Sequence, residues 1–264
     1  MGYGPAPTSQ LPGAGTLRGQ LDSGPVTGTF QVIGHPTVTE VLALSGAQVI
    51  VADAEHAALD LGTLEQLVRA GDARAASVVI RVPAIDSSLS RALDTGAAGV
   101  VIPRVESAAD AAAIVRATRF PPLGARGLGP ARATDFGLDL ISHRAAANDE
   151  LLVVAMVETS RGLAAVNEIV AVDGIDVIMV GPADLASSLG VEPGSDTHLA
   201  AIDTIVDAAR AAGRHIGIHC ADAADAELQR SRGIRLLLIG TDVAFLATTA
   251  IAQFSPQPFN EERP

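Results

Sequence analysis

The sequence predicts an α/β protein with the (β/α)₈ barrel fold, and three observations favour that fold. Eight short segments rich in Val and Ile alternate with Ala-rich segments that have the spacing of amphipathic helices. The strand segments contain few polar residues, which is typical of a parallel sheet covered by helices. The chain has 264 residues, close to the usual length of about 250 residues for eight such units.

The predicted strands and helices follow one another in regular order. An open doubly wound sheet is the alternative, but no GxGxxG motif follows the first strand, which weakens a dinucleotide-binding interpretation. Helices are clearest over 61–71, 107–119 and 197–213, and Gly213 is placed to end the last of them. The predicted strands cover 26–33, 47–53, 77–83, 98–103, 151–158, 175–181, 214–220 and 234–240.

The barrel is predicted to be a single domain over 23–254. The flanking segments 1–22 and 255–264 are rich in Gly, Pro and polar residues, and we expect both to be flexible. Residues 120–149, between the fourth and fifth strands, break the regular order. We expect this stretch to be a lid or a subunit interface, because long loops without a role are uncommon; the alternative is a plain surface excursion. It carries Arg126, Arg132, Asp135 and His143.

Composition excludes several classes of function. All 18 basic residues are Arg, so Schiff-base aldolases, pyridoxal-phosphate enzymes and P-loop proteins, which need a Lys amine, are excluded. A net charge of −12 and few aromatic residues indicate that nucleic acid is not a partner. A single cysteine, Cys220, excludes a disulfide framework. With neither a secretory signal nor a membrane-spanning run, we expect a cytoplasmic protein without a membrane partner.

Polar residues gather where the predicted strands end. In a (β/α)₈ barrel the chemistry lies at the C-terminal ends of the strands, so these side chains would converge on one rim. Polar groups there are unfavourable unless they are paired or bind a ligand. The residues at these ends are Asp53, Glu55, His56, Arg81, Arg104, Glu158, the turn Gly181-Pro182-Ala183-Asp184, His219, Cys220 and Asp242.

Each of these residues also has a structural alternative. Glu158 and Asp184 could be acids at helix N-termini, where the helix dipole favours them. His56 could be a loop histidine bonded to Asp53, and Arg81 could be a buried ion-pair partner of a nearby carboxylate such as Glu55. Their convergence on one rim favours function over these alternatives.

Taken together, these residue types point to one kind of chemistry. Glu158 and Asp184, without Cys or His at zinc-like spacing, indicate a hard cation such as Mg²⁺ or Mn²⁺. The backbone of Gly181–Asp184, at a helix start, suits a carboxylate or a phosphate. Arg81 could balance the charge of an enolate oxygen, and His56, oriented by Asp53, could move protons. These are the parts needed to form and quench an enolate.

The motifs that carry these residues resemble those of a known family. They are GTF (28–30), DAEH (53–56), RVP (81–83), RFPPLGARGLG (119–129), VETSRGL (157–163), VDGIDVIMVGPADLASSLG (172–190) and IGTD (239–242). From about Gly28 to Phe245 the chain resembles the HpcH/HpaI family of metal-dependent (class II) pyruvate aldolases. That group includes 2,4-dihydroxyhept-2-ene-1,7-dioate aldolase and 2-keto-3-deoxy sugar-acid aldolases.

The resemblance implies a TIM barrel of the phosphoenolpyruvate/pyruvate type and an assignment for each site residue. Glu158 and Asp184 would bind Mg²⁺, Mn²⁺ or Co²⁺; His56 would be catalytic with Asp53 as its partner, and Arg81 would stabilise the enolate. The pyruvate carboxylate would meet the backbone at Pro182-Ala183-Asp184. The last helix is usually exchanged between neighbours in this family, which implies a homo-oligomer, a hexamer or trimer.

The chain departs from the family pattern on the side expected to receive the aldehyde. Many members have Gln where this sequence has Met156, and small or apolar residues where it has Arg104, His219 and Cys220. The segment after RGLG is also shorter. We therefore expect Arg104 or His219 to face the aldehyde and to favour an acidic or hydroxylated acceptor; a local salt bridge is the alternative for either residue.

The function implied is reversible aldol cleavage of a 4-hydroxy-2-oxo acid to pyruvate and an aldehyde, through a metal-bound pyruvate enolate. One alternative is a citrate-lyase-β-like acyl-CoA lyase, which would need a basic groove for the CoA phosphates. Another is a non-catalytic paralogue, against which His56, Arg81, Glu158 and Asp184 argue because an inactive site has no reason to keep buried charges.

Overall fold

Eight parallel strands close into a barrel, as the sequence predicts. The structure, a computed structural model, describes residues 14–255, and the barrel order is β1-β2-β3-β4-β5-β6-β7-β8 with β8 paired to β1. Each predicted strand coincides with an observed one. The strands are β1 (Val26–Gln31), β2 (Val49–Asp53), β3 (Ser77–Arg81), β4 (Gly99–Ile102), β5 (Leu152–Val157), β6 (Val177–Val180), β7 (His215–Cys220) and β8 (Leu236–Thr241).

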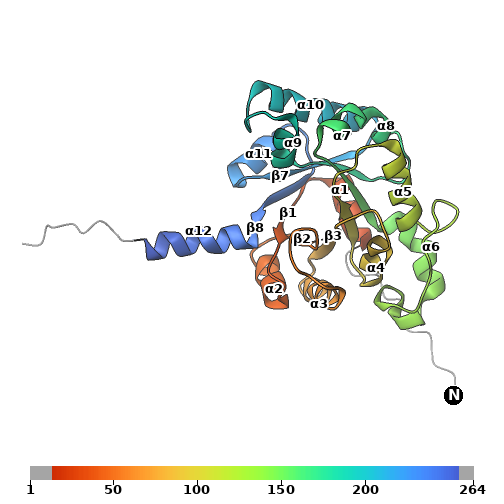
Figure 1. Cartoon of the computed structure of the whole chain (residues 1–264). Helices are drawn as coiled ribbons and strands as arrows, with labels where there is room; N and C mark the ends of the chain where they lie inside the picture. The colour runs from red at the N-terminus through yellow and green to blue at the C-terminus, as the bar shows by residue number, and fades with distance from the viewer. Residues whose placement is uncertain (1–13, 256–264) are drawn as a thin grey trace, which may run out of the picture.

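Helices surround this barrel, and α12 extends away from it (Figure 1). The predicted helices at 61–71, 107–119 and 197–213 are confirmed as α3, α5 and α10. The helices are α1 (Ala14–Ser23), α2 (Pro36–Leu44), α3 (Leu61–Asp72), α4 (Ser88–Asp94), α5 (Ala108–Thr118), α6 (Leu140–Glu150), α7 (Ser160–Ala164), α8 (Val166–Val170), α9 (Pro182–Leu189), α10 (Asp196–Ala211), α11 (Ala223–Ser231) and α12 (Asp242–Phe254), with a 3₁₀ helix η1 (Arg132–Gly137) before α6.

The strands are apolar because both of their faces are covered. Every residue of β2, β3, β5 and β6 is buried, so continuous Val and Ile runs replace the alternating pattern of a half-exposed sheet. Glycine is required where strands approach most closely. A Cβ at Gly28 would lie 1.9 Å from the Val49 carbonyl oxygen, which explains the glycine of the GTF motif.

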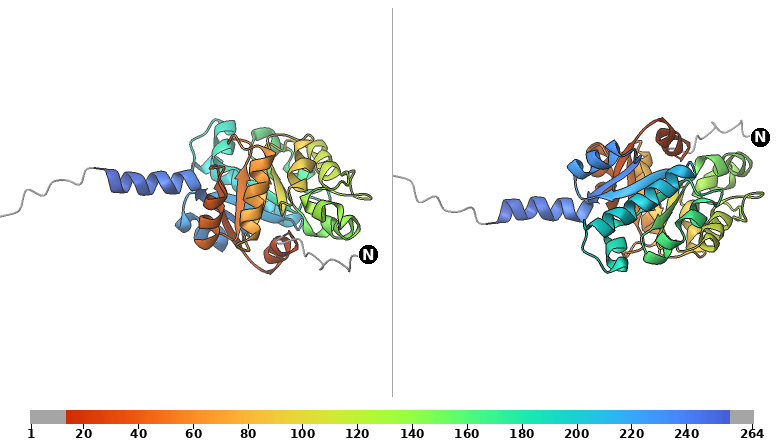
Figure 2. Two further views of the ribbon diagram at one scale, coloured as in Figure 1. Left: turned by 90° about the horizontal axis from the view of Figure 1, so that it is seen from below. Right: turned by 90° about the horizontal axis from the view of Figure 1, so that it is seen from above.

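The segment 1–22, expected to be flexible, contains a helix. Residues 14–23 form α1, which lies against one end of the barrel (Figure 2). Its Leu17 and Leu21 side chains are fully buried. This part of the segment is helical because two leucines four residues apart pack on an apolar surface of the barrel. Residues 1–13 and 256–264, where the rest of the expected flexible ends falls, lie outside the described part of the chain.

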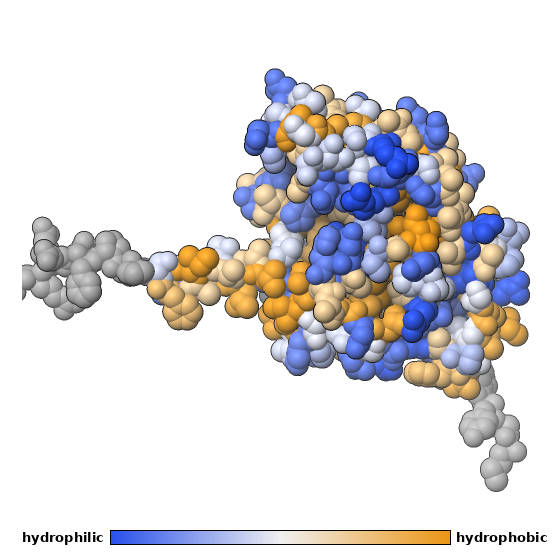
Figure 3. All heavy atoms as spheres, in the orientation of Figure 1, coloured by the Kyte–Doolittle hydropathy of each residue, from blue (hydrophilic) through white to orange (hydrophobic). Residues whose placement is uncertain are grey.

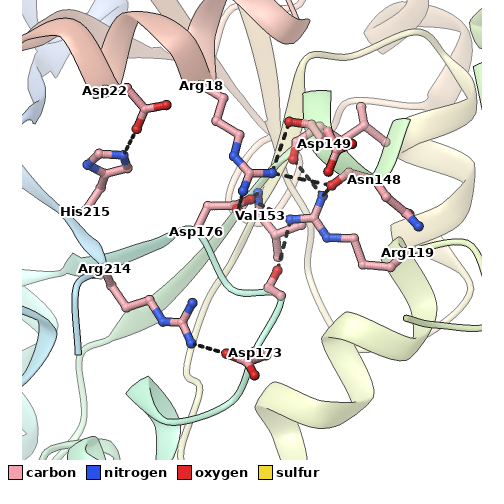
Figure 4. Close-up of polar contacts among 12 residues, drawn as sticks. Arg18, Asp22, Arg119, Asn148, Asp149, Val153, Asp173, Asp176, Arg214 and His215 are labelled. Atoms are coloured by element: carbon pink, nitrogen blue, oxygen red, sulfur yellow. Dashed lines mark hydrogen bonds and ion pairs between the residues drawn. The ribbon is translucent and has the colours of Figure 1, made fainter. Parts of the chain in front are cut away.

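A buried ion-pair network fastens this end of the barrel (Figure 4). The Arg119 side chain is 1% exposed, and its Nη2 lies 2.6 Å from Asp176 Oδ2. It also donates to the carbonyl oxygens of Asn148, Leu151 and Gly174 at 2.8–2.9 Å. Arg18 of α1 reaches the other oxygen of Asp176 at 3.3 Å. The network thus joins α1 to β6 and to the end of α6.

The stretch 120–149 is more ordered than a loop and packs on the outside of the barrel. It contains η1 and most of α6. Arg126 pairs with Asp94 of α4 at 2.9 Å, and Arg132 pairs with Asp72 at the end of α3. His143 is buried against the ring of Phe120. Arg126 and Arg132 are therefore engaged with neighbouring helices, which supports a packing role for the stretch.

Helix α12 projects from the barrel with much of its surface apolar (Figures 2 and 3). Phe245, Leu246, Ile251 and Phe254 are 42–85% exposed. Together with α2 it borders an apolar groove of about 620 Å³. None of the helices in residues 14–255 is both long enough and apolar enough to cross a membrane.

The Arg119 network yields a stability prediction. Replacement Arg119→Met leaves Asp176 without its closest cation and removes hydrogen bonds to three carbonyls, of which that of Leu151 is buried. We expect a loss of about 3–5 kcal/mol in the free energy of unfolding, the usual effect of breaking a buried ion pair from one side. Urea denaturation followed by circular dichroism measures it.

The matched control is Arg161→Met. Arg161 is 78% exposed and pairs with Glu106 at 3.1 Å, so its loss should change the free energy of unfolding by less than about 1 kcal/mol. Equal effects of the two replacements would contradict the structural role given to the network.

Candidate active site at the C-terminal rim

Asp53 and Arg81 form the base of the candidate site. They are register partners at the ends of β2 and β3, which places their side chains next to each other. Arg81 Nε donates to Asp53 Oδ1 at 2.9 Å and Nη2 donates to Oδ2 at 2.7 Å, a bidentate ion pair. Burial alone would raise the pKa of Asp53, but the hydrogen bonds and charge of Arg81 lower it below its ordinary value. Asp53 is therefore ionised and holds Arg81 in place.

The same carboxylate shapes the turn that carries His56. Asp53 Oδ1 accepts the backbone N–H groups of Glu55 and His56 at 3.1 and 3.3 Å. The expected contact between Asp53 and the imidazole ring is not seen, because Asp53 is engaged with these amides and with Arg81. The ring of His56, whose side chain is 63% exposed, instead has Nε2 3.5 Å from Glu55 Oε2.

Glu55 is the residue of this turn to which sequence reasoning gave no functional role. Besides His56, its Oε2 lies 3.3 Å from Arg81 Nε, so the ion pair that the sequence offered as an alternative for Arg81 also exists. Burial raises the pKa of Glu55, and the charges of Arg81 and His56 only partly offset this. The acidic residue beside His56 in the DAEH motif was the only sequence signal for it.

Glu158, at the end of β5, is the most unusual carboxylate of the site. Its side chain is buried, and Oε1 accepts the backbone N–H of Arg104 at 2.8 Å. Oε2 is buried too, and no described residue donates a hydrogen bond to it. Burial raises the pKa of Glu158, the Arg104 amide opposes this, and the negative charges of Asp184 and Glu55 add to the rise. A buried oxygen of this kind is unfavourable unless a cation or donor binds it.

The turn Gly181–Asp184 passes directly in front of Glu158. A Cβ at Gly181 would lie 2.5 Å from Glu158 Oε2, so only glycine leaves room for that oxygen. Helix α9 begins at Pro182, which has no N–H to leave unpaired at this position. The amides of Ala183 and Asp184 are in the first turn, where backbone N–H groups have no partner within the helix.

These residues enclose a polar cavity of about 250 Å³. The structure thus brings together four of the residues expected at the site, namely His56, Arg104, Glu158 and Asp184. With Glu55, the cavity wall carries three carboxylates and one guanidinium on a small surface. The lining residues are Glu55, His56, Arg104, Glu158, Thr159, Asp184, Ser187 and Ser188.

The donor set fits a hard divalent cation. Glu158 and Asp184 offer oxygen ligands, one of which is buried and unpartnered. Within residues 14–255, no group of three or more His, Cys, Asp or Glu side chains is arranged to hold a metal ion. Two carboxylates alone match the way Mg²⁺ and Mn²⁺ bind, with the remaining positions filled by water and substrate oxygens.

Arg104 occupies the cavity wall in a strained backbone conformation. Its φ is +51°, a left-handed value that is uncommon outside glycine, and this conformation presents its N–H to Glu158. Its side chain is exposed and, among the described residues, no carboxylate forms an ion pair with it. The guanidinium is thus available to a ligand in the cavity.

His219 lies away from this cavity. The centroid of its ring lies 5.9 Å from that of Phe30, and the guanidinium of Arg81 lies 4.7 Å from the same Phe30 centroid. Burial lowers the pKa of His219. Cys220 is buried, and burial raises the pKa of its thiol to about 12, so it is not a nucleophile at neutral pH. Phe30 was not singled out from the sequence.

Comparisons with known proteins show several aldolases that this chain resembles over most of its length. The chain is 39% identical to a hydroxypyruvate/pyruvate aldolase of Roseovarius nubinhibens, over 93% of this chain and 95% of that one. It is 37% identical to a 4-hydroxy-2-oxovalerate aldolase of Rhodococcus jostii, over 85% and 89%. The crystal structure of an HpcH/HpaI aldolase/citrate lyase family protein from Burkholderia cenocepacia superposes with a TM-score of 0.85 at 36% identity, covering 90% of this chain and 98% of that one.

The sequence model of one family accounts for most of the chain. It matches residues 27–249, which include every residue of the candidate site and all of the eight strands except the first residue of β1. The protein belongs to the HpcH/HpaI aldolase/citrate lyase family.

Proposed function

We propose that this protein is a metal-dependent aldolase that reversibly cleaves a 4-hydroxy-2-oxo acid to pyruvate and an aldehyde. The observation that carries the proposal is the buried, unpartnered Oε2 of Glu158 at a cavity shared with Asp184. The names of the similar aldolases, which act on hydroxypyruvate, pyruvate or 4-hydroxy-2-oxovalerate, support the substrate class.

Glu158 and Asp184 would hold the metal, with Mg²⁺, Mn²⁺ or Co²⁺ as the candidates. A bound divalent cation would polarise the oxygens of the 2-oxo acid and so draw electrons from the bond that breaks. The amides of Ala183 and Asp184 would receive the substrate carboxylate, and Gly181 and Pro182 would shape the turn that presents them. Arg81, held by Asp53, would face the oxygen on which negative charge develops.

His56 would carry the proton. In the cleavage direction a base removes the proton of the 4-hydroxyl group, and the bond between C3 and C4 breaks as the aldehyde forms. The electron pair remains on the pyruvate enolate, and a proton delivered to C3 completes pyruvate. The exposed ring of His56, which lies beside Glu55 at the cavity, supports this role.

We also propose that the protein is a cytoplasmic homo-oligomer, a trimer or a hexamer. The exposed apolar residues of α12 and the groove beside it support packing against a second copy, because isolated apolar patches of this kind mark interaction sites. A monomeric mass in light scattering would contradict the oligomer.

The experiment that tests the proposed function is deuterium exchange into the methyl group of pyruvate in D₂O. Proton NMR follows it with Mg²⁺, with Mn²⁺ (chelated before detection) and with EDTA. We expect exchange only with metal, because enolisation is half of the aldol reaction and needs no knowledge of the aldehyde. Glu158→Ala should abolish it, and His56→Ala should slow it about 100-fold or more.

Glu65→Gln provides the control for loss of a carboxylate, since Glu65 forms a surface ion pair with Arg69 on α3. This variant should exchange the methyl protons of pyruvate at the wild-type rate. Exchange that persists in EDTA, or its absence with every metal, would refute the proposal. Such a result would favour an acyl-CoA lyase or a non-catalytic protein.

A second prediction concerns the aldehyde. We propose that the unpaired guanidinium of Arg104 receives an acidic acceptor. In Arg104→Ala, kcat/KM for addition of pyruvate to succinic semialdehyde should fall about tenfold or more relative to the neutral aldehyde butanal, the effect of losing one hydrogen bond to a charged group. Steady-state kinetics with both aldehydes measure the ratio.

Pyruvate exchange should continue in this variant, because the backbone N–H that binds Glu158 is kept. Arg161→Ala is the charge-matched control. We expect His219→Ala to change the ratio less, since its ring packs on Phe30 outside the cavity. An equal loss with both aldehydes in Arg104→Ala would exclude an acceptor role for this side chain.

A further inference from the structure

His198 is a buried histidine next to the site that neither the sequence analysis nor the proposed reaction uses. It lies in the first turn of α10 and is 4% exposed. Its Nδ1 accepts the backbone N–H of Gly194 at 2.9 Å, and its Nε2 lies 2.8 Å from the carbonyl oxygen of Pro182. An amide N–H can only donate and a carbonyl can only accept, so Nδ1 is bare and Nε2 carries the proton. Both ring nitrogens thus have a hydrogen-bond partner, Nδ1 as acceptor and Nε2 as donor.

The Pro182 end of this bridge belongs to the turn that faces the cavity. The Pro182 carbonyl and the Ala183 N–H are the two ends of one peptide group, which is planar, so in the trans form they point in opposite directions. A donor that holds the carbonyl on the α10 side therefore directs the Ala183 N–H to the other side. That amide and the neighbouring Asp184 are at the start of α9, where they are free to bind a ligand.

The connection between α9 and α10 needs a contact, such as the two hydrogen bonds of His198, that holds it in one conformation. Gly190 and Gly194 both have positive φ, +66° and +81°, so the chain between the two helices contains two residues with little conformational preference. His198 joins this connection to the first turn of α9 with one side chain. Ser195 fixes the bridge from the other side, because its hydroxyl caps α10 by accepting the His198 N–H at 3.4 Å.

We infer that His198 is a positioning residue for the carboxylate of the 2-oxo acid, which it serves by holding the Pro182–Ala183 peptide in the orientation that binds. The inference rests on the proposed function, because it assigns that carboxylate to the Ala183 and Asp184 amides. A group that orients a binding amide, and does not move a proton, should govern substrate affinity more than turnover.

Three replacements separate the two ends of the bridge. His198→Gln places a donor near the position of Nε2 and keeps the bond to Pro182. His198→Asn places an acceptor near the position of Nδ1 and keeps only the bond to Gly194. His198→Leu keeps the size and neither bond. Each variant is compared with the wild type by thermal unfolding without metal, by calorimetric titration of oxalate in Mg²⁺, and by KM and kcat for pyruvate exchange.

We expect His198→Asn and His198→Leu to raise the KM for pyruvate and the Kd for oxalate about tenfold, the size of one hydrogen bond to a charged group. His198→Gln should restore both, and kcat should change little. The inference is overturned if all three variants bind alike, or if binding follows the melting temperature whichever bond is kept. Failure of the proposed function is a separate outcome, since the wild type itself would then neither bind oxalate with Mg²⁺ nor exchange pyruvate.

Discussion

Asp53 and Arg81 face each other where β2 pairs with β3, and the ion pair between them organises the rest of the rim. One carboxylate oxygen of Asp53 also binds two amides of the turn that carries Glu55 and His56. Arg81 in turn contacts Glu55 and lies over the ring of Phe30. A guanidinium that is nearly buried would be unfavourable by itself, so each of these contacts depends on the ionised Asp53.

The carboxylates that line the cavity show what such a site requires of the fold. Glu158 and Glu55 are carboxylates whose pKa values burial raises, and Asp184 adds a third negative charge nearby. Like charges in a low-dielectric cavity oppose folding when no cation is bound. The strained backbone of Arg104 is a further unfavourable feature. The large apolar core and the Arg119 network at the far end of the barrel provide the stability that tolerates them.

The sequence was sufficient for the fold and for much of the site because both follow from local patterns. Apolar strand runs predict the barrel, and barrel closure brings the ends of β2, β5 and β6 to one rim, so the placement of His56, Glu158 and Asp184 around a cavity follows. The contacts that the sequence does not predict depend on side-chain rotamers or on segments that are far apart in the sequence. The sequence suggests a contact between Asp53 and the ring of His56. In the structure the carboxylate of Asp53 instead binds Arg81 and two backbone amides.

Helix α1 and His198 make contacts that depend on segments far apart in the sequence. The sequence of α1 has little tendency to form a helix by itself. The helix is stabilised by the burial of Leu17 and Leu21 on the barrel, which local composition does not predict. His198 is sixteen positions from Pro182, and only the packing of α10 against α9 brings the two together. Nothing in the spacing of a single histidine on a helix indicates such a bridge.

The central claim is that Glu158 is kept buried and unpaired in order to bind a cation, and the most direct test is thermal unfolding of Glu158→Gln with and without Mn²⁺. Folding raises the pKa of Glu158, so at a pH above this raised pKa the ionised carboxylate lowers the free energy of unfolding. At a pH below the ordinary pKa of 4.5 the carboxyl group is protonated in both states, and this destabilisation is absent.

Without metal, the variant should therefore melt higher than the wild type near pH 8, by about 2–4 °C for each kcal/mol relieved, and the difference should vanish near pH 4. Mn²⁺ should stabilise the wild type and leave the variant unchanged. A variant that is less stable than the wild type at pH 8, or that keeps the full response to Mn²⁺, would contradict the account.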